Sequence, residues 1–233
     1  MIVKNIIFDL DNTLYSPTSA MDAGIARRMM EAVADFWCVD MDKAVELRHK
    51  NLPRFSTTLE WLRSEGLSDV EAYFRKVHPD NEADELMPDP ALRPFLESIE
   101  QNKIILTNAP REHADRVLKK LGVTDLFSAV IDIRCCGLRG KPYASSYKLA
   151  MQKIGGSVDD TIFLDDQYKY TDGFEALGGT AILVGNKNGT HLSPDSAVLS
   201  GGPSSHSGRT VKIDSVYDLP KFLSGDVGLQ GAS

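Results

Sequence analysis

The sequence predicts an α/β protein: a Rossmann-like parallel sheet core with a helical cap inserted after the first strand. Short apolar runs alternate along the chain with patterns of helical periodicity, as is typical of a parallel sheet with crossover helices. Residues 16–88 break this alternation, because they contain helical spacing and no good strand. We therefore expect a core of residues 1–15 and 89–223, a helical cap of residues 16–88 and a flexible tail of residues 224–233.

Six apolar runs are the expected strands, and each has the length of a strand buried in a parallel sheet. They span residues 3–8, 103–106, 129–131, 161–164, 180–184 and 210–213. Helical patterns are expected at residues 111–121, 145–154, 170–177 and 216–223. Three of these patterns are followed by glycine (Gly122, Gly155 and Gly178), which commonly ends a helix.

The inserted segment shows the spacing of one apolar helix face. This face comprises Met21, Ile25, Met29, Val33 and Phe36, and shorter helical patterns follow near Ala44, Leu59 and Tyr73. Residues 185–208 and the C-terminal residues 224–233 are instead rich in Gly and Ser. Both segments are expected to be a loop or a tail.

Composition narrows the classes of partner. A chain of 233 residues with 42% hydrophobic and 25% charged residues is typical of a globular protein, and its net charge of −7 disfavours a nucleic-acid polymer as partner. No apolar run approaches the ~20 residues of a membrane span, and the N-terminus does not resemble a signal peptide. Three cysteines provide no disulfide framework. We expect a cytoplasmic monomer or homodimer, without a membrane partner.

Two carboxylates follow the first expected strand. If the extended backbone continues through residue 11, Asp9 and Asp11 point to the same side and Leu10 points to the other. Two nearby carboxylates repel each other, so the pair suits a hard cation or a shared proton. The alternative, that the two residues simply make a turn after the strand, stays open on these residues alone.

Polar residues also follow the second and third expected strands. Thr107 and Asn108 supply donors suited to phosphate oxygens, although the same residues are common in plain turns. Lys141 precedes Pro142, which we expect in the first turn of the following helix. A positive charge at that end of a helix is favourable only beside a bound anion, and a solvent-exposed Lys141 is the alternative.

The fourth expected strand ends in an acidic pair, Asp165 and Asp166. Such a pair is costly at a buried strand end unless it is solvated, paired or metal-bound. One of the two could instead cap the following helix. Because ligand sites in open α/β sheets form at the carboxyl ends of the strands, we expect all four strand ends to meet in one cleft.

Taken together, these motifs resemble those of the haloacid dehalogenase superfamily. The motifs are Asp9-Leu10-Asp11-Asn12-Thr13, Thr107-Asn108, Lys141-Pro142 and Asp165-Asp166, and the resemblance covers residues 2 to 184. Within the superfamily the chain is most similar to the pyrimidine 5′-nucleotidase-like group. That likeness rests on residues 8–15, on Thr107-Asn108-Ala109, and on His113-Ala114-Asp115-Arg116-Val117-Leu118 followed by Leu121-Gly122.

The resemblance implies a Mg²⁺-dependent phosphatase acting on a small phosphorylated metabolite, with a nucleoside 5′-monophosphate as one candidate. Asp9 would be the nucleophile that forms an aspartyl-phosphate, and Asp11 would protonate the leaving oxygen and then help to deprotonate water. The implied Mg²⁺ ligands are the Asp9 carboxylate, the Asp11 backbone carbonyl and Asp166, with Asp165 close by or bound through water. The implied phosphate-binding residues are Thr107, Asn108 and Lys141.

The sequence departs from the family pattern after the acidic pair. Gln167 and Tyr170 stand where Ser and Asn are usual, and Asp172 is a candidate to replace the missing polar group. Ala144 stands where a second proline is common in the third motif. These changes leave a non-catalytic binding protein as one alternative function.

Two enzymatic alternatives share the fold. A phosphomutase would use the same core chemistry and stays open. A dehalogenase is disfavoured because Asp11 is present, and carbon–halogen displacement has no need of that acid. Substrate choice is expected to lie in the cap, where the basic segment 48–54 is a candidate contact and Tyr73 could stack on a base. Tyr15 could stack in the same way.

Overall fold

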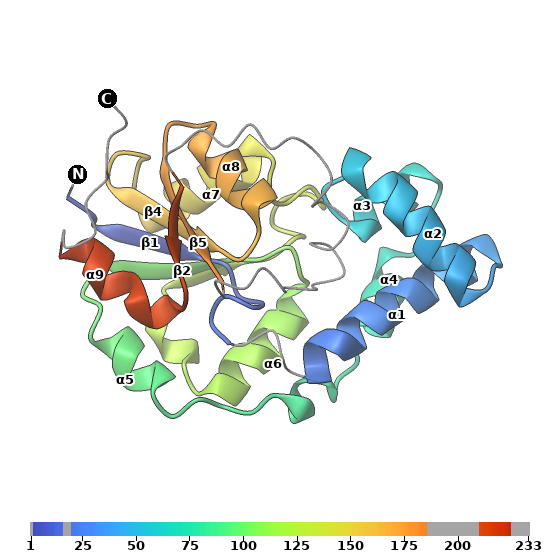
Figure 1. The fold of residues 1–233 in the computed structure, drawn as a ribbon, viewed down its shortest axis with the longest axis horizontal. Helices are drawn as coiled ribbons and strands as arrows, with labels where there is room; N and C mark the ends of the chain where they lie inside the picture. Colours follow the sequence, from blue (N-terminus) through green and yellow to red (C-terminus); the bar gives the residue numbers. More distant parts are fainter. Residues whose placement is uncertain (1, 16–19, 186–209, 225–233) are drawn as a thin grey trace. The chain divides into compact units, whose positions relative to one another are not determined.

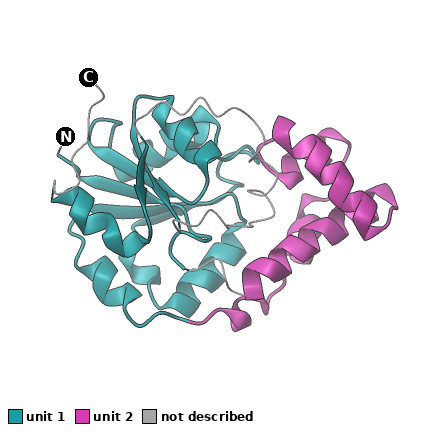
Figure 2. Ribbon diagram, viewed as in Figure 1, with its two compact units in different colours: residues 1–16, 88–191, 203–233 teal, residues 17–87, 192–202 magenta. Residues whose placement is uncertain are grey.

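The computed structural model describes residues 2–15, 20–185 and 210–224. The chain divides into two compact units (Figure 2): unit 1 comprises residues 1–16, 88–191 and 203–233, and unit 2 comprises residues 17–87 and 192–202. The predicted Gly/Ser-rich loop lies outside the described residues except for residue 185, and the predicted tail does so except for residue 224.

Unit 1 is built on a six-stranded parallel sheet with the order β3-β2-β1-β4-β5-β6 (Figure 1). The strands are β1 (Asn5–Phe8), β2 (Asn102–Leu106), β3 (Ala129–Ile131), β4 (Thr161–Asp165), β5 (Thr180–Val184) and β6 (Val211–Ile213). All five neighbouring pairs are parallel. The predicted α/β class and parallel sheet are therefore confirmed, and the ends of the expected strands differ from the observed ones by two residues at most.

The helices of unit 1 cover both faces of this sheet. They are α5 (Leu92–Glu97), α6 (Arg111–Leu121), α7 (Ala144–Ile154), α8 (Tyr168–Glu175) and α9 (Leu219–Leu223), with 3₁₀ turns at Thr124–Leu126 and Val216–Asp218. Helices α5 and α6 lie on one face, whereas α7 and α8 lie on the other (Figure 1). The chain first moves from β1 outward to β3 and then returns to β4, so the strand order reverses between β1 and β4. Such a reversal is where ligand sites form in open α/β sheets.

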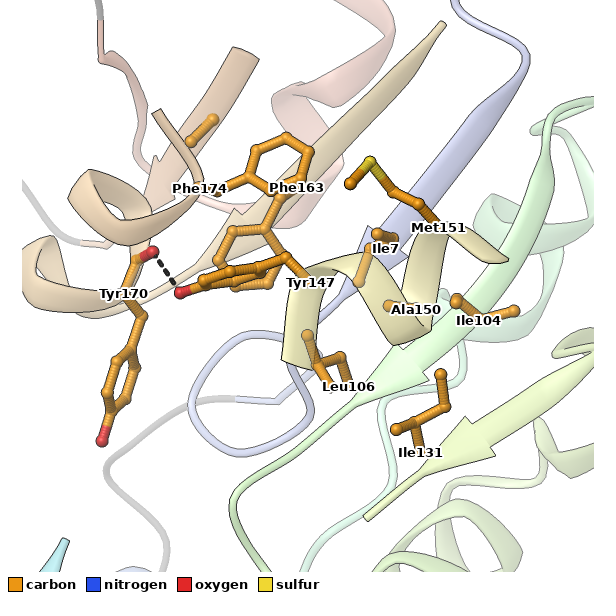
Figure 3. Packing of buried hydrophobic residues seen from close by; sticks show 11 residues of the cluster. Ile7, Ile104, Leu106, Ile131, Tyr147, Ala150, Met151, Phe163, Tyr170 and Phe174 are labelled. Atoms are coloured by element: carbon orange, nitrogen blue, oxygen red, sulfur yellow. Dashed lines mark hydrogen bonds between the residues drawn. The ribbon is translucent and has the colours of Figure 1, made fainter. Parts of the chain in front are cut away.

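The face covered by α7 and α8 is held by aromatic packing (Figure 3). The ring of Tyr147 contacts those of Phe163 and Phe174 at centroid distances of 5.3 and 5.5 Å. The Tyr147 hydroxyl donates a 2.7 Å hydrogen bond to the backbone carbonyl of Tyr170, which ties α7 to α8. Aromatic pairs at such distances add about 0.5–1.5 kcal/mol beyond the area they bury. The packing thereby holds α7 and α8 against the sheet beside β4.

The described residues 20–87 of unit 2 form helices joined by short connections, with no strand among them. It contains α1 (Ala20–Trp37), α2 (Met41–Asn51), α3 (Thr58–Ser64) and α4 (Val70–Val77), with 3₁₀ turns at Leu52–Arg54 and Glu82–Glu85. Three of the helices begin at residues whose side chains accept a backbone N–H, namely Asp40, Thr57 and Asp69. Every helical pattern that the sequence shows in this segment corresponds to a helix.

None of the helices in the described parts of the chain has the length and apolar character that a membrane crossing requires.

Candidate active site

The carboxyl ends of β1 and β4 bring two buried carboxylates together. The backbone N–H of Asp9 continues the sheet by donating to the Leu164 carbonyl at 2.8 Å, while Asp165 is the last residue of β4. Asp166 completes the group, since ligand oxygens of the three side chains all lie within 4.8 Å of one another. Asp9 is 6% exposed and Asp165 is fully buried, so their charges are largely shielded from water.

Lys141 lies between two of these carboxylates. Its ammonium donates to Asp9 Oδ1 at 2.6 Å and to Asp165 Oδ2 at 2.5 Å. Burial alone would lower the pKa of Lys141, but the Asp165 and Asp9 carboxylates outweigh it and raise that pKa above its ordinary value. The solvent-exposed alternative for Lys141 is therefore wrong, because the residue is 1% exposed.

The expected place of Pro142 is also wrong. Helix α7 begins at Ala144 with Tyr143 as its N-cap, so Pro142 precedes the helix and does not form its first turn. The Lys141–Pro142 peptide bond is cis. The Lys141 side chain thus belongs to the loop before α7 and owes its position to the carboxylates it contacts.

Asn108 holds the backbone of Lys141 through two hydrogen bonds. Its side-chain amide donates to the Lys141 carbonyl at 2.9 Å and accepts the Lys141 N–H at 2.8 Å. Gly140 makes this approach possible, because a Cβ at that position would lie 2.0 Å from Asn108 Oδ1. The predicted phosphate-binding residue Asn108 therefore positions Lys141 in addition to any contact with a substrate.

Thr107 lies directly after β2, the sheet neighbour of β1. Its hydroxyl oxygen accepts the Ala109 N–H at 3.0 Å, and the residue is 1% exposed. This bond turns the chain sharply after the strand, and it uses the oxygen as an acceptor while leaving the hydroxyl proton for donation. Its predicted role as a phosphate donor is compatible with this bond.

Burial raises the pKa of each carboxyl in the group. The pKa of Asp9 rises from 3.8 to about 7, because desolvation and the neighbouring Asp165 and Asp11 outweigh the attraction of Lys141. Desolvation raises the pKa of Asp165 and of Asp166 as well, with the Asp165 charge contributing to the latter. One buried oxygen, Asp166 Oδ2, has no hydrogen-bond partner. Clustered, desolvated carboxylates with a lone oxygen are the donor set that a hard cation such as Mg²⁺ prefers.

The backbone that carries Asp11 has a different conformation from the one that we expected. Strand β1 ends at Phe8, and a turn follows in which Asn12 has φ of 62°. The assumption that extended backbone continues through residue 11 is therefore wrong. Asp11 Oδ1 instead receives the Tyr15 hydroxyl at 2.6 Å and lies 2.7 Å from His113 Nε2.

Three further residues contact the site residues Asp11 and Lys141, and the sequence analysis did not predict these contacts. The first two are Tyr15 and His113; the 113–118 run that carried the family likeness was the available signal for His113. The third is Tyr170: the Lys141 ammonium lies 4.9 Å from the centroid of its ring and 5.5 Å from that of Phe163. An aromatic ring at this distance attracts a cation, so Tyr170 takes a place at the site although it departs from the family pattern.

Two residues of unit 2 that were candidates for substrate contact lie inside that unit. Arg48 is 3% exposed, and its Nε donates to the Thr58 hydroxyl at 2.9 Å. Tyr73 is buried and packs edge-on against Phe74. Both side chains therefore serve the packing of unit 2.

Solved structures with this fold include enzymes of different chemistry. The L-2-haloacid dehalogenase of Xanthobacter autotrophicus is 19% identical with a TM-score of 0.61, over 96% of this chain and 99% of that one. A HAD phosphatase of Thermococcus onnurineus is 17% identical with a TM-score of 0.62, over 96% and 99%. A HAD hydrolase of Bacillus subtilis, bound to magnesium, is 14% identical with a TM-score of 0.60, over 96% and 100%. At these identities the likeness shows the fold.

Family membership rests on the sequence match. The model of the haloacid dehalogenase-like hydrolases matches residues 3–178, which include the helical insertion and the carboxyl ends of β1, β2, β3 and β4. The chain belongs to the haloacid dehalogenase-like hydrolase family.

Proposed function

We propose that this protein is a Mg²⁺-dependent phosphatase that hydrolyses a small phosphate monoester through an aspartyl-phosphate. The observation that carries the proposal is the second carboxyl, Asp11, held by two hydrogen-bonding neighbours close enough to Asp9 to raise its pKa. A phosphate ester needs an acid for its leaving oxygen, whereas displacement of a halide does not. The site therefore favours the phosphatase over the dehalogenase.

The first half of the reaction transfers the phosphoryl group to Asp9. A carboxylate oxygen of Asp9 forms a bond to phosphorus as the ester P–O bond breaks, and Asp11 gives its proton to the departing oxygen. Lys141 offsets the negative charge spread over the phosphoryl oxygens. Its contacts with Asp9 and Asp165 support this role, because they hold the ammonium beside the proposed nucleophile.

The second half releases phosphate and restores both carboxyls. A water oxygen attacks phosphorus, the bond to Asp9 breaks, and Asp11 accepts a proton from the water. Asp11 is then again the proton donor for the next ester, so the cycle consumes one water and one ester. Both halves require an Asp11 carboxyl that stays near the phosphorus while its proton comes and goes.

The acidic group fits a divalent cation. The carboxylates of Asp9, Asp165 and Asp166 and the backbone carbonyl of Asp11 would hold Mg²⁺, and the lone buried oxygen of Asp166 supports this assignment. When bound, the ion would neutralise charge on the phosphoryl group and lower the repulsion between the carboxylates. The magnesium bound by the B. subtilis hydrolase adds support from a protein of the same fold.

Adding Mg²⁺ is expected to raise the melting temperature of the purified protein at pH 8 and to raise it less at pH 5. Protons compete with the cation for carboxyls whose pKa values are raised, so binding weakens as the pH falls. Differential scanning fluorimetry with and without Mg²⁺ measures the shift. Asp166→Asn should reduce the shift, and the exposed Asp159→Asn should leave it unchanged; equal shifts in both variants would contradict the metal site.

The substrate proposal is tested by phosphate release. A panel of nucleoside monophosphates, sugar phosphates and simple esters, assayed with and without Mg²⁺, should show Mg²⁺-dependent release from at least one class. Asp11→Asn should lower kcat/KM by about 10²–10⁴-fold for alkyl esters and less for aryl esters, whose leaving oxygens need no proton. Equal losses for the two ester types would count against an acid role for Asp11.

The same panel separates the remaining alternatives. Net transfer of phosphate within or between sugars without release would favour a phosphomutase, whereas binding without turnover would favour a non-catalytic protein. By the family resemblance we further propose that the helical insertion acts as a cap that selects the leaving group, with a nucleoside 5′-monophosphate as the first candidate substrate.

A further inference from the structure

We propose that His113, together with Tyr15, is a positioning residue that orients the Asp11 carboxyl for proton transfer to the leaving group. The inference rests on the proposed phosphatase function and assigns a role to a residue that the predicted site does not include. It starts from two short contacts on one oxygen: Tyr15 Oη lies 2.6 Å and His113 Nε2 lies 2.7 Å from Asp11 Oδ1.

His113 lies 102 positions from Asp11 in the chain, and its own helix fixes its position. It lies in the first turn of α6, on the buried face that also carries Ala114 and Val117, and it is fully buried. The start of this helix is fixed by Asp132, a 3% exposed carboxylate that accepts the Arg111 N–H at 3.0 Å. The imidazole therefore meets Asp11 from a fixed element, which is the arrangement that precise orientation requires.

The two contacts have a direction. An ionised carboxylate only accepts hydrogen bonds, so His113 Nε2 carries the hydrogen and donates it, as the Tyr15 hydroxyl does. An oxygen that accepts two hydrogen bonds is a poor site for a proton. When Asp11 carries a proton, these two donors direct it to Oδ2, from which it passes to the ester oxygen as the P–O bond breaks.

A purely structural role for the pair makes a different prediction. Asp11 could serve only to satisfy a buried imidazole, and removal of His113 would then lower stability and reduce activity equally for every substrate. The side chain of Asp11 is 28% exposed, so water can solvate this carboxylate without either donor. The Tyr15 and His113 donors are thus not needed to solvate Asp11, yet both bind the same oxygen. Orientation of the Asp11 carboxyl explains this arrangement better.

The test compares kcat/KM for an alkyl phosphate and for p-nitrophenyl phosphate, because this ratio reports the step in which the leaving group departs. His113→Leu should lower kcat/KM for the alkyl ester by ~10-fold or more and change the aryl value by less than ~3-fold. His113→Gln, which can present an N–H near the position of Nε2, should recover most of the loss. Tyr15→Phe should act in the same direction with a smaller effect.

Melting temperatures and a control on the same helix separate orientation from folding. Lys119→Ala, on the exposed face of α6, should leave both esters unaffected. The inference would be overturned if His113→Leu lowered kcat/KM equally for the two esters, or for neither. It would also be overturned if His113→Gln melted like the wild type but did not recover kcat/KM for the alkyl ester. A wild-type protein that releases phosphate from neither ester would instead overturn the phosphatase proposal itself.

Discussion

Asp9→Asn is expected to lower phosphatase turnover by on the order of 10⁴-fold or more while the protein stays folded. The amide that replaces the carboxylate is nearly isosteric but cannot supply the charged oxygen that attacks phosphorus. Lys141 keeps its second partner, Asp165 at 2.5 Å, so its ammonium is not left unpaired. Steady-state phosphate release measures the loss, and mass spectrometry of the acid-quenched enzyme should detect a phosphoryl adduct in the wild type alone.

The same variant has a second expected signature in its stability. The folded-state pKa of Asp9, about 7, lies above its ordinary value of 3.8. The native state then holds a proton that the unfolded chain has already released, so this group lowers stability progressively as the pH rises from about 4 to about 7. Relative to wild type, metal-free Asp9→Asn should therefore gain stability across that pH range.

Urea unfolding of the metal-free protein at pH 5 and pH 8 measures this difference. The exposed Asp159→Asn serves as the matched control and should show neither the loss of turnover nor the pH-dependent gain. Near-full activity of Asp9→Asn would show that the nucleophile is another group, and a pH-independent difference in stability would contradict the raised pKa of Asp9.

Lys141→Met is expected to cost about 3–5 kcal/mol of unfolding free energy at pH 8 and to abolish most turnover. The substitution preserves much of the volume of the side chain but leaves two buried carboxylates without the ammonium that both contact. Their pKa values, already raised by burial, rise further without Lys141. At low pH the two carboxyls are protonated in the native state and no longer need the ammonium. The loss of unfolding free energy should therefore be smaller at pH 5 than at pH 8.

Lys103→Met is the control for the loss of a lysine. The Lys103 ammonium is half-buried and donates only to the backbone carbonyls of Ile99 and Gln101 in the contacts described. Its loss should cost about 1 kcal/mol, with little dependence on pH between 5 and 8. Denaturant unfolding of both variants at the two pH values makes the comparison. Equal, pH-independent deficits would mean that the carboxylates do not depend on Lys141.

Much of the fold could be predicted from local pattern. The strands β3 and β5 and the helix α6 have the predicted bounds, because buried apolar runs and a clear 3.6-residue period end at glycine or polar residues. Helix α5 was not predicted, since it is six residues long and contains Pro94, which obscures any helical period. Helix α8 begins two residues earlier than expected, at Tyr168, where no side chain caps its start.

The candidate site, like the fold, could be predicted only in part from the sequence. The sequence alone identified the strand ends beside Asp9, Thr107 and Asp165 and the segment after β3 that carries Lys141, because the carboxyl ends of parallel strands share one edge of a sheet. It left open whether extended backbone or a turn follows β1, because the left-handed φ that Asn12 adopts is not required by residue type alone.

The sequence by itself thus determined the class of fold, the edge of the sheet where chemistry is expected and the residue types available there. Only the tertiary structure decided which groups meet: that Lys141 lies between two carboxylates, that Tyr170 lies beside its ammonium, and that His113 reaches Asp11. The physical reason is one of range. Periodicity and turn chemistry act over a few residues, whereas a hydrogen bond of 2.7 Å between residues 102 positions apart depends on strand order and helix packing across the whole core.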